Sequence, residues 1–287
     1  MSRIGRQYAY SQNSIRSPLL VKRLLDRSCI SYSDIVIEIG AGKGVITKEL
    51  AKRCKKVVAY EIDPLLYKSL SCELNHYTNV RLINADFLKS SLPHYSYKVF
   101  SNIPFNFTSR MLSRLLRSSN PPLVTYLILQ EEAAEKYLGV PRETQVSLLL
   151  KPLFGIKILS RLSRTDFSPK PRVNSVLVEF EKRDSPLILR SGYKAYCDFI
   201  VYATTQWKPT IGACLGKVLT KEQIRRLSNN LGFSIKSAPL GVSFEQWVGL
   251  FNYYDRFVDD SKKILVRGSY LHQQEIQKKL KKVYRTR

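Results

Sequence analysis

A glycine-rich loop holds the first residues that could do chemistry. Glu38-Ile-Gly40-Ala-Gly42-Lys-Gly44 follows a short β-branched stretch and precedes an apolar stretch of helical character. Glycines at such a junction permit a tight turn and a close approach of the backbone to a ligand. Glu61 lies at the end of the next apolar stretch, where a carboxylate can accept hydrogen bonds from both hydroxyls of a ribose. The combination predicts a nucleoside-binding site rather than a turn alone.

The spacing of the glycines separates two kinds of nucleoside cofactor. G-x-G-x-G departs from the dinucleotide pattern G-x-G-x-x-G, and a pyrophosphate needs the N-terminus of the helix clear. Glu38 stands just before the first glycine and would repel a pyrophosphate. A cofactor with a cationic sulfonium and an amino group suits this loop better, so the sequence favours S-adenosyl-L-methionine over NAD.

Two further residues are candidates for holding the cofactor's adenine. Asp86 and Phe87 end a third predicted strand. The Asp86 carboxylate can accept a hydrogen bond from an adenine amine, and the Phe87 ring can flank the base. An alternative stays open, because an Asp at this place is also a common cap of a turn or helix.

The segment Ser101-Asn102-Ile103-Pro104-Phe105 points to the reaction. An adenine amine is a poor nucleophile because its lone pair is delocalised into the ring. Two acceptors, the Asn102 side-chain oxygen and the Ile103 carbonyl, could hold its two protons and draw the nitrogen toward a tetrahedral shape. Pro104 stiffens the loop, and Phe105 offers a face on which a flipped-out base can stack. The pattern predicts methyl transfer to an adenine N6, which needs no metal because a sulfonium is already an activated leaving group.

An alternation of strands and helices must position these residues. We expect strands at 34–40, 56–61, 80–86, 97–101 and 125–129. Helices are expected at 45–54, 64–74, 109–116 and 131–137. Such an order is typical of a parallel sheet covered by helices, which binds ligands beyond the carboxyl ends of its strands. The stretches 154–162 and 175–181 predict an antiparallel pair at one edge.

The pattern changes after this pair of strands. From Tyr193 onward only helices are predicted, and Thr220 and Ser243 each begin a capping-box pattern. We therefore expect a catalytic domain at 1–185, a helical RNA-binding domain at 186–260 and a basic tail at 261–287.

The charge of the chain indicates its partner. Among 287 residues, 47 are Lys or Arg and 23 are Asp or Glu, which gives a formal charge of +24. That excess is far beyond the needs of solubility and favours a nucleic acid, with an anionic membrane as the alternative. The five cysteines match no metal or disulfide pattern. Without an apolar signal or membrane span, the chain is expected to be cytoplasmic.

Taken together, these motifs resemble the rRNA adenine-N6 methyltransferase family. Glu38–Gly44 is similar to the family's cofactor loop, Glu61 to its ribose acid, Asp86 to its adenine-binding acid, and Asn102–Phe105 to its N-[IL]-P-[YF] loop. The resemblance extends to Tyr10-Ser-Gln12-Asn13, to Phe167-Ser-Pro-Lys-Pro-Arg-Val-Asn-Ser175 and to Ser243-Phe-Glu-Gln-Trp247. It implies a Rossmann-like class I methyltransferase sheet, mostly parallel, with a smaller C-terminal all-α domain.

The resemblance also implies roles. The expected catalytic residues are Asn102, Ile103, Phe105 and Phe167, with Phe167 beside the target base. The residues expected to bind S-adenosyl-L-methionine are Gln12, Asn13, Glu38, Gly40, Gly42, Glu61, Ile62, Asp86, Phe87 and Asn102. No metal is expected.

Within the family, S-N-I-P-F favours the erythromycin-resistance (Erm) branch over small-subunit enzymes, which typically have G-N-L-P-Y. An Erm enzyme acts as a monomer on large-subunit rRNA before assembly and confers resistance to macrolides, lincosamides and streptogramin B. Small-subunit rRNA dimethylation and a non-enzymatic RNA-binding protein are the alternatives. Ser14, where the family often has Phe, and the long basic C-terminus depart from the family pattern.

Overall fold

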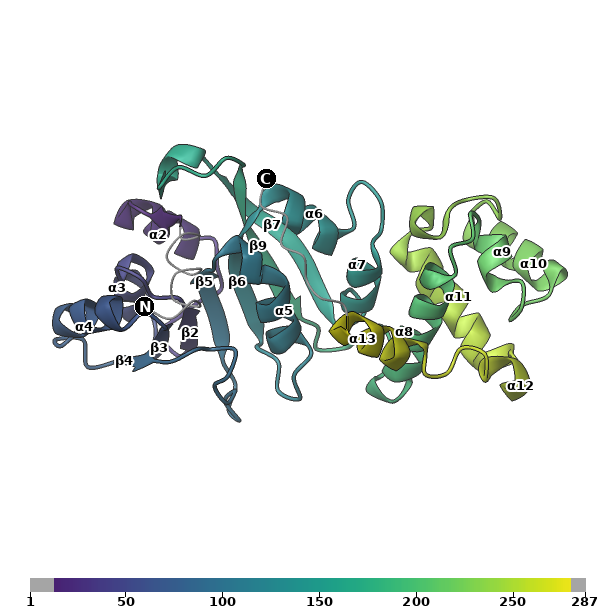
Figure 1. Cartoon of the computed structure of the whole chain (residues 1–287), viewed down its shortest axis with the longest axis horizontal. Helices are drawn as coiled ribbons and strands as arrows, with labels where there is room; N and C mark the ends of the chain where they lie inside the picture. Colours follow the sequence, from purple (N-terminus) through teal and green to yellow (C-terminus); the bar gives the residue numbers. More distant parts are fainter. Residues whose placement is uncertain (1–12, 280–287) are drawn as a thin grey trace. The chain divides into compact units, whose positions relative to one another are not determined.

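The computed structural model describes residues 13–279, and the chain divides into two compact units. Of the described residues, the first unit, here the sheet unit, comprises 13–134 together with Phe154–Lys182. The second, here the helical unit, comprises Glu135–Leu153 together with 183–279. Figure 1 shows the strands gathered in one unit and only helices in the other.

A seven-stranded sheet forms the centre of the sheet unit, in the order β4-β3-β2-β5-β6-β9-β7. The strands are β2 (Ile35–Ile39), β3 (Lys56–Glu61), β4 (Val80–Asn84), β5 (Lys98–Asn102), β6 (Val124–Gln130), β7 (Phe154–Leu162) and β9 (Ser175–Lys182). The first five are parallel, and β9 pairs antiparallel with both β6 and β7. The predicted fold class, a mostly parallel sheet with an antiparallel edge, is confirmed.

Helices cover this sheet. Its central strands β2 and β6 are therefore buried along nearly their whole length, as expected of parallel strands. The helices of the sheet unit are α2 (Pro18–Leu25), α3 (Val45–Ala51), α4 (Pro64–Glu73) and α5 (Thr108–Leu116), whereas α6 (Glu131–Leu138) begins in the sheet unit and ends in the helical unit. Apolar side chains of α2, α3 and α4 pack with alternate residues of the strands, among them Val36, Val57 and Tyr126. A separate two-stranded sheet joins β1 (Ser14–Ile15) to β8 (Phe167–Ser168).

The strand order reverses between β2 and β5. Their ladder pairs only Val36 with Lys98 and Ile37 with Val99, so the two strands separate toward their carboxyl ends. Beyond the ladder, the Ile39 N–H donates to the Ser101 hydroxyl at 2.7 Å, and this bond is buried. The reversal creates the crevice in which such sheets bind ligands.

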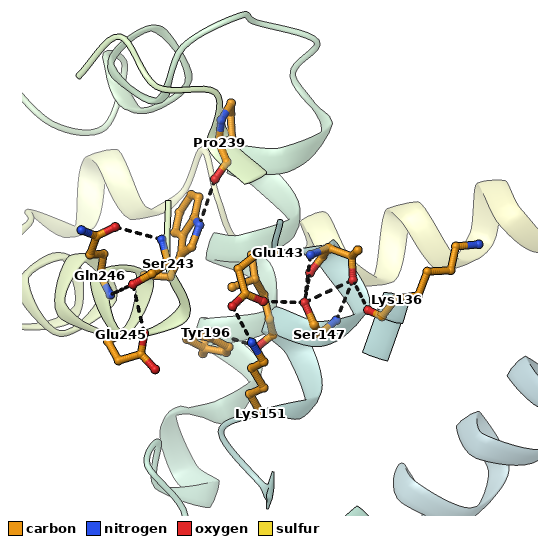
Figure 2. A network of polar contacts seen from close by, with 12 residues as sticks. Lys136, Glu143, Ser147, Lys151, Tyr196, Pro239, Ser243, Glu245 and Gln246 are labelled. Carbon is orange, nitrogen blue, oxygen red and sulfur yellow. Dashed lines mark hydrogen bonds and ion pairs between the residues drawn. The ribbon is translucent and has the colours of Figure 1, made fainter. Parts of the chain in front are cut away.

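The helical unit packs around a second apolar core. Its helices are α7 (Gln145–Leu150), α8 (Arg190–Thr205), α9 (Ile211–Leu215), α10 (Lys221–Leu231), α11 (Phe244–Phe257), α12 (Asp260–Lys263) and α13 (Ser269–Lys279). The capping boxes predicted at Thr220 and Ser243 are confirmed. Figure 2 shows the second of them, in which Ser243 and Gln246 exchange hydrogen bonds, near the carbonyl of Pro239 that accepts from the Trp247 indole.

Residues 135–153 group with the C-terminal helices, although the sequence places them in the first domain. The Tyr196 hydroxyl on α8 donates to the Leu148 carbonyl on α7 at 2.9 Å. Glu143 accepts from Ser147 and forms an ion pair with Lys151, in the network drawn in Figure 2. These long-range contacts have no local signature in the sequence.

Part of the predicted basic tail is folded. The buried Asp198 carboxylate on α8 accepts hydrogen bonds from the Gly268 and Tyr270 N–H groups at 3.1 and 2.9 Å. These bonds satisfy free amides at the start of α13 and hold it against α8. Residues 280–287 lie outside the described residues. Within the described part of the chain, no helix is long and apolar enough to cross a membrane.

Candidate active site

Two neighbouring hollows lie at the carboxyl ends of the parallel strands. The first is lined by Asn13, Glu38, Asn102 and Phe105, among others. The second is lined by Glu61, Ile62, Asp86 and Phe87, among others. Gly40 and Pro104 line both hollows, so the two are adjacent. The structure thus brings together the residues of three sequence motifs that are up to 64 positions apart, from Glu38 to Asn102.

The glycine loop connects β2 to α3. Gly40, Gly42 and Gly44 have φ values of 79°, 57° and 74°, in the left-handed region that favours glycine. A Cβ on Gly40 would meet no atom within 4 Å, so this backbone faces open space. A Cβ on Gly44 would lie 2.3 Å from Leu70, so this glycine lets α3 approach α4. Two of the loop's glycines therefore serve different purposes, ligand access and helix packing.

Glu38 is a buried carboxyl group at the end of β2. It is 1 % exposed, and Thr47 in the first turn of α3 donates to its Oε2 at 2.6 Å. Burial raises the pKa of Glu38 to about 8, repulsion from Glu61 adds to this effect, and the Thr47 hydrogen bond opposes it. A cation placed in the first hollow would favour the ionised form of Glu38.

Glu61 is buried as well, but backbone amides hold it. Gly42 N–H donates to its Oε2 and Asp63 N–H donates to its Oε1, both at 2.8 Å. Burial raises the pKa of Glu61, while these backbone bonds lower it. The carboxylate is fixed in one orientation, and each oxygen keeps a lone pair for a further donor.

Asp86 forms the bond of a turn cap and also lines the second hollow, and its adenine-binding role stays a prediction. Its Oδ1 accepts from the Leu88 N–H at 2.9 Å. Phe87 is 3 % exposed, and its ring meets Tyr60 edge-on with the centroids 5.1 Å apart. The Phe87 ring is therefore held rigidly in the wall of this hollow.

Asn102 is the last residue of β5. Its Nδ2 donates to the Asn13 carbonyl at 2.7 Å, so a main-chain group occupies the donor end of the amide. Its Oδ1 accepts no hydrogen bond from the described residues. The Phe107 N–H donates to the Pro104 carbonyl at 2.9 Å and closes the short 3-10 helix η1 (Phe105–Phe107). The Asn102–Phe105 loop therefore presents an acceptor and an aromatic ring to the first hollow.

Of the remaining expected site residues, Phe167 lies elsewhere and Gln12 is not described. Phe167 is 2 % exposed and lines neither hollow, because it packs in the core of the sheet unit and pairs with Ile15 across β1 and β8. Its place beside the target base stays a prediction. Gln12 lies outside the described residues.

Sequence reasoning missed two residues that support the site. Thr47 holds Glu38, and Ser101 joins the end of β5 to the end of β2. Ser101 directly precedes Asn102, so its buried hydroxyl could have been suspected from its position. Nothing in the local sequence around Thr47 indicates its role.

The sheet topology and the hollows at its switch point define a class I, Rossmann-like methyltransferase fold. A crystal structure of the 23S rRNA methyltransferase ErmE superposes with a TM-score of 0.79 at 27% identity, over 85% of this chain and 100% of that one. A dimethyladenosine transferase from Plasmodium falciparum superposes with a TM-score of 0.68 at 19% identity, over 85% and 98%.

Sequence comparison is more specific than the fold. The model of the family "Ribosomal RNA adenine dimethylase" matches residues 5–256. An rRNA adenine N-6-methyltransferase of Limosilactobacillus reuteri is 35% identical over 253 residues, which are 86% of this chain and 96% of the relative. One of Staphylococcus aureus is 35% identical over 248 residues, with the same shares. The chain belongs to this family of rRNA adenine-N6 methyltransferases.

Proposed function

We propose that the protein transfers methyl groups from S-adenosyl-L-methionine to N6 of a specific adenosine in 23S rRNA. One observation carries this proposal: the acceptor Oδ1 of Asn102 has no hydrogen-bond partner among residues 13–279, and Asn102 lines the same hollow as the buried Glu38. An amine to be methylated needs acceptors, and a cationic methyl donor needs a carboxylate nearby. Both are present within one crevice.

The hollows fit this cofactor. The open space above Gly40, the carboxylate of Glu38, and the fixed carboxylates of Glu61 and Asp86 together suit a cationic amino acid, a ribose and an adenine. Glu61 would accept from the ribose hydroxyls, Asp86 from the adenine amine, and Ile62 and Phe87 would flank the base. When bound, the sulfonium supplies an activated methyl group.

The residues of the chain orient the target amine. Asn102 Oδ1 and the Ile103 carbonyl accept the two N6 protons, so the nitrogen lone pair turns out of conjugation with the ring. Asn13 keeps the Asn102 amide from rotating, since its carbonyl holds Nδ2 at 2.7 Å. Phe105 stacks on the flipped base, which offsets part of the few kcal/mol that flipping costs. Most of the acceleration comes from this positioning, because a nitrogen that gains positive charge loses its proton readily.

The choice of large-subunit rRNA rests on likeness. The solved structure with a TM-score of 0.79 is that of a 23S rRNA methyltransferase, and the loop S-N-I-P-F favours the Erm branch. Methylation there would lower the affinity of macrolides, lincosamides and streptogramin B for the ribosome. With rRNA not yet assembled as the substrate, we place the enzyme in the cytoplasm, as a monomer that does not act at a membrane.

The test is to treat protein-free 23S and 16S rRNA with the enzyme and labelled S-adenosyl-L-methionine. Mapping the modified positions should give N6-methylated adenosine at one site in 23S rRNA, and the label per site counts the methyl groups. Modification of 16S rRNA alone would contradict the proposed 23S target but support adenine-N6 methylation. Label on neither RNA would refute the proposed function.

A further inference from the structure

Trp207 is an aromatic side chain that the fold leaves in solvent. It lies between α8 and α9 in the helical unit, and its side chain is 99 % exposed. The chain has two tryptophans, and the other one, Trp247, is 0 % exposed and bonded through its indole N–H to the Pro239 carbonyl. The Trp207 indole therefore contributes nothing to the core of the helical unit.

The backbone of Trp207 is strained as well. Its φ of 55° is the one positive value of a residue other than glycine among residues 13–279. Left-handed backbone is unfavourable for a bulky side chain, and such strain gathers at binding sites where the surrounding structure enforces it. A glycine would fit this position without strain, so stability does not account for the tryptophan.

The surrounding loop holds this conformation firmly. Gln206 Nε2 donates to the Cys214 carbonyl at 3.1 Å, and Lys208 Nζ donates to the Ala213 carbonyl at 3.1 Å. Thr210 caps α9 by accepting from the Ala213 N–H at 3.2 Å. Both neighbours of Trp207 are therefore anchored to α9, so a ligand that contacts the indole would not have to order the loop.

The charge around this loop favours an anionic partner. Residues 199–244 contain a single acid, Glu222, against six basic residues: Lys208, Lys217, Lys221, Arg225, Arg226 and Lys236. Lys236 belongs to the segment that lies alongside α9, because the Ile211 N–H donates to the Ser237 carbonyl at 2.8 Å. Lys217 and Lys236 are both exposed. The indole thus belongs to a segment rich in cations.

We infer that Trp207 is a stacking platform for an unpaired base of the RNA substrate. A flat, exposed indole on an anchored loop, within a segment rich in Lys and Arg, is a combination suited to single-stranded nucleic acid, through base stacking and phosphate contacts respectively. This inference rests on the proposed function, since it needs an RNA substrate. Stacking tolerates any base, so Trp207 contributes affinity and leaves the choice of the methylated adenosine to other residues.

The protein offers a direct spectroscopic test, because Trp247 is buried and Trp207 is the exposed fluorophore. Binding of a protein-free 23S rRNA transcript should quench the tryptophan emission of the wild type, and Trp207→Phe should abolish most of this change. Trp207→Ala should weaken RNA binding about tenfold, which corresponds to about 1.4 kcal/mol. Affinity for S-adenosyl-L-methionine and turnover at saturating RNA should stay as in the wild type.

Three control variants distinguish base stacking from a change in stability, from a loss of charge and from the loss of any exposed ring. Trp207→Gly should bind RNA as weakly as Trp207→Ala while its melting temperature equals or exceeds that of the wild type. Lys236→Ala removes an exposed cation that does not anchor the loop and should flatten the salt dependence of RNA binding, whereas Trp207→Ala should leave the slope unchanged. Tyr32→Ala removes an exposed ring of the sheet unit, 77 % exposed, and should leave RNA affinity unchanged.

Unchanged RNA affinity in Trp207→Ala would overturn this inference, provided that the wild type methylates the RNA. A wild type that methylates no RNA would instead refute the proposed function. Quenching by vesicles of anionic lipid but not by RNA would assign the indole to a membrane and also overturn the inference.

Discussion

The two hollows differ in how their polar groups are satisfied. In the second hollow, Glu61 accepts from two backbone amides and Asp86 accepts from a third. In the first hollow, Glu38 has one hydroxyl partner, Thr47, and Asn102 Oδ1 accepts no bond from the described residues. The second hollow is preorganised for a ligand, whereas the acceptors of the first hollow have fewer hydrogen bonds from the described residues.

The difference between the hollows is consistent with a division of roles within one crevice. In the proposed function, the fixed carboxylates of Glu61 and Asp86 would bind parts of the cofactor that do not change during the reaction, so rigidity costs nothing there. The acceptors of Asn102 and Glu38 would instead bind the reacting amine and the cationic cofactor. Hydrogen bonds to these groups stabilise the reaction most where charge develops in the transition state. We therefore expect substitution of Asn102 to affect turnover and substitution of Glu61 to affect cofactor affinity, while Glu38, in the first hollow, should affect how cofactor affinity depends on pH.

Asn102→Ala should give the largest effect. It removes the acceptor for one N6 proton, and loss of one preorganised contact to a developing charge typically costs about a hundredfold or more in turnover. Affinity for S-adenosyl-L-methionine, measured by calorimetry, should stay nearly intact. Turnover close to that of the wild type would remove Asn102 from the mechanism.

Glu61→Gln should mainly weaken cofactor binding. A glutamine side chain offers one acceptor, so its amide would face the N–H of either Gly42 or Asp63. We expect affinity for S-adenosyl-L-methionine to fall about 10-fold to 100-fold, as for the loss of a hydrogen bond to a charged group. Turnover at saturating cofactor should change far less. A loss confined to turnover would contradict the division between the hollows.

Glu38→Gln should change how the protein responds to pH. Burial raises the pKa of Glu38 from 4.5 to about 8 in the folded state, so the folded protein binds this proton more tightly than the unfolded chain. The free energy of unfolding of the ligand-free protein should therefore fall as pH rises from about 4.5 to about 8.

The variant lacks this contribution, so its melting temperature relative to the wild type should rise over the same interval. Cofactor affinity of the wild type should increase as pH approaches about 8, because a cationic ligand favours ionised Glu38. The variant should lose this dependence. Parallel pH profiles of the two proteins would show that Glu38 does not ionise on binding.

Much of the fold follows from local patterns. β3 spans the predicted residues 56–61, and Gly232 ends α10 with a φ of 72°, because capping and turns depend on neighbouring residues. Most of the residues predicted to carry chemistry line the two hollows, because the ends of parallel strands meet at one edge of the sheet; their roles stay predictions. Pairing of β1 with β8 was not predicted, because two-residue strands show no alternation. The role of Asp198 and the grouping of residues 135–153 with the helical unit were not predicted either. Both depend on contacts between residues far apart in the sequence, which produce no local pattern.

Ser101→Ala should give the smallest effect. It tests the hydrogen bond between Ile39 and Ser101, which joins two strands far apart in the sequence. The substitution leaves the buried Ile39 N–H without its acceptor, which costs about 1–3 kcal/mol in unfolding free energy. This bond joins β2, which precedes the glycine loop, to the residue next to Asn102. We therefore expect turnover to fall several-fold, with cofactor affinity less affected.

A matched control exists in the same sheet. The buried Thr125 hydroxyl has no hydrogen-bond partner among the described residues, so Thr125→Val should be nearly neutral in both stability and turnover. If both variants lose equal stability and neither loses turnover, Ser101 serves packing alone. A selective fall in turnover for Ser101→Ala would instead show that the bond across the diverging strands sets the place from which Asn102 acts.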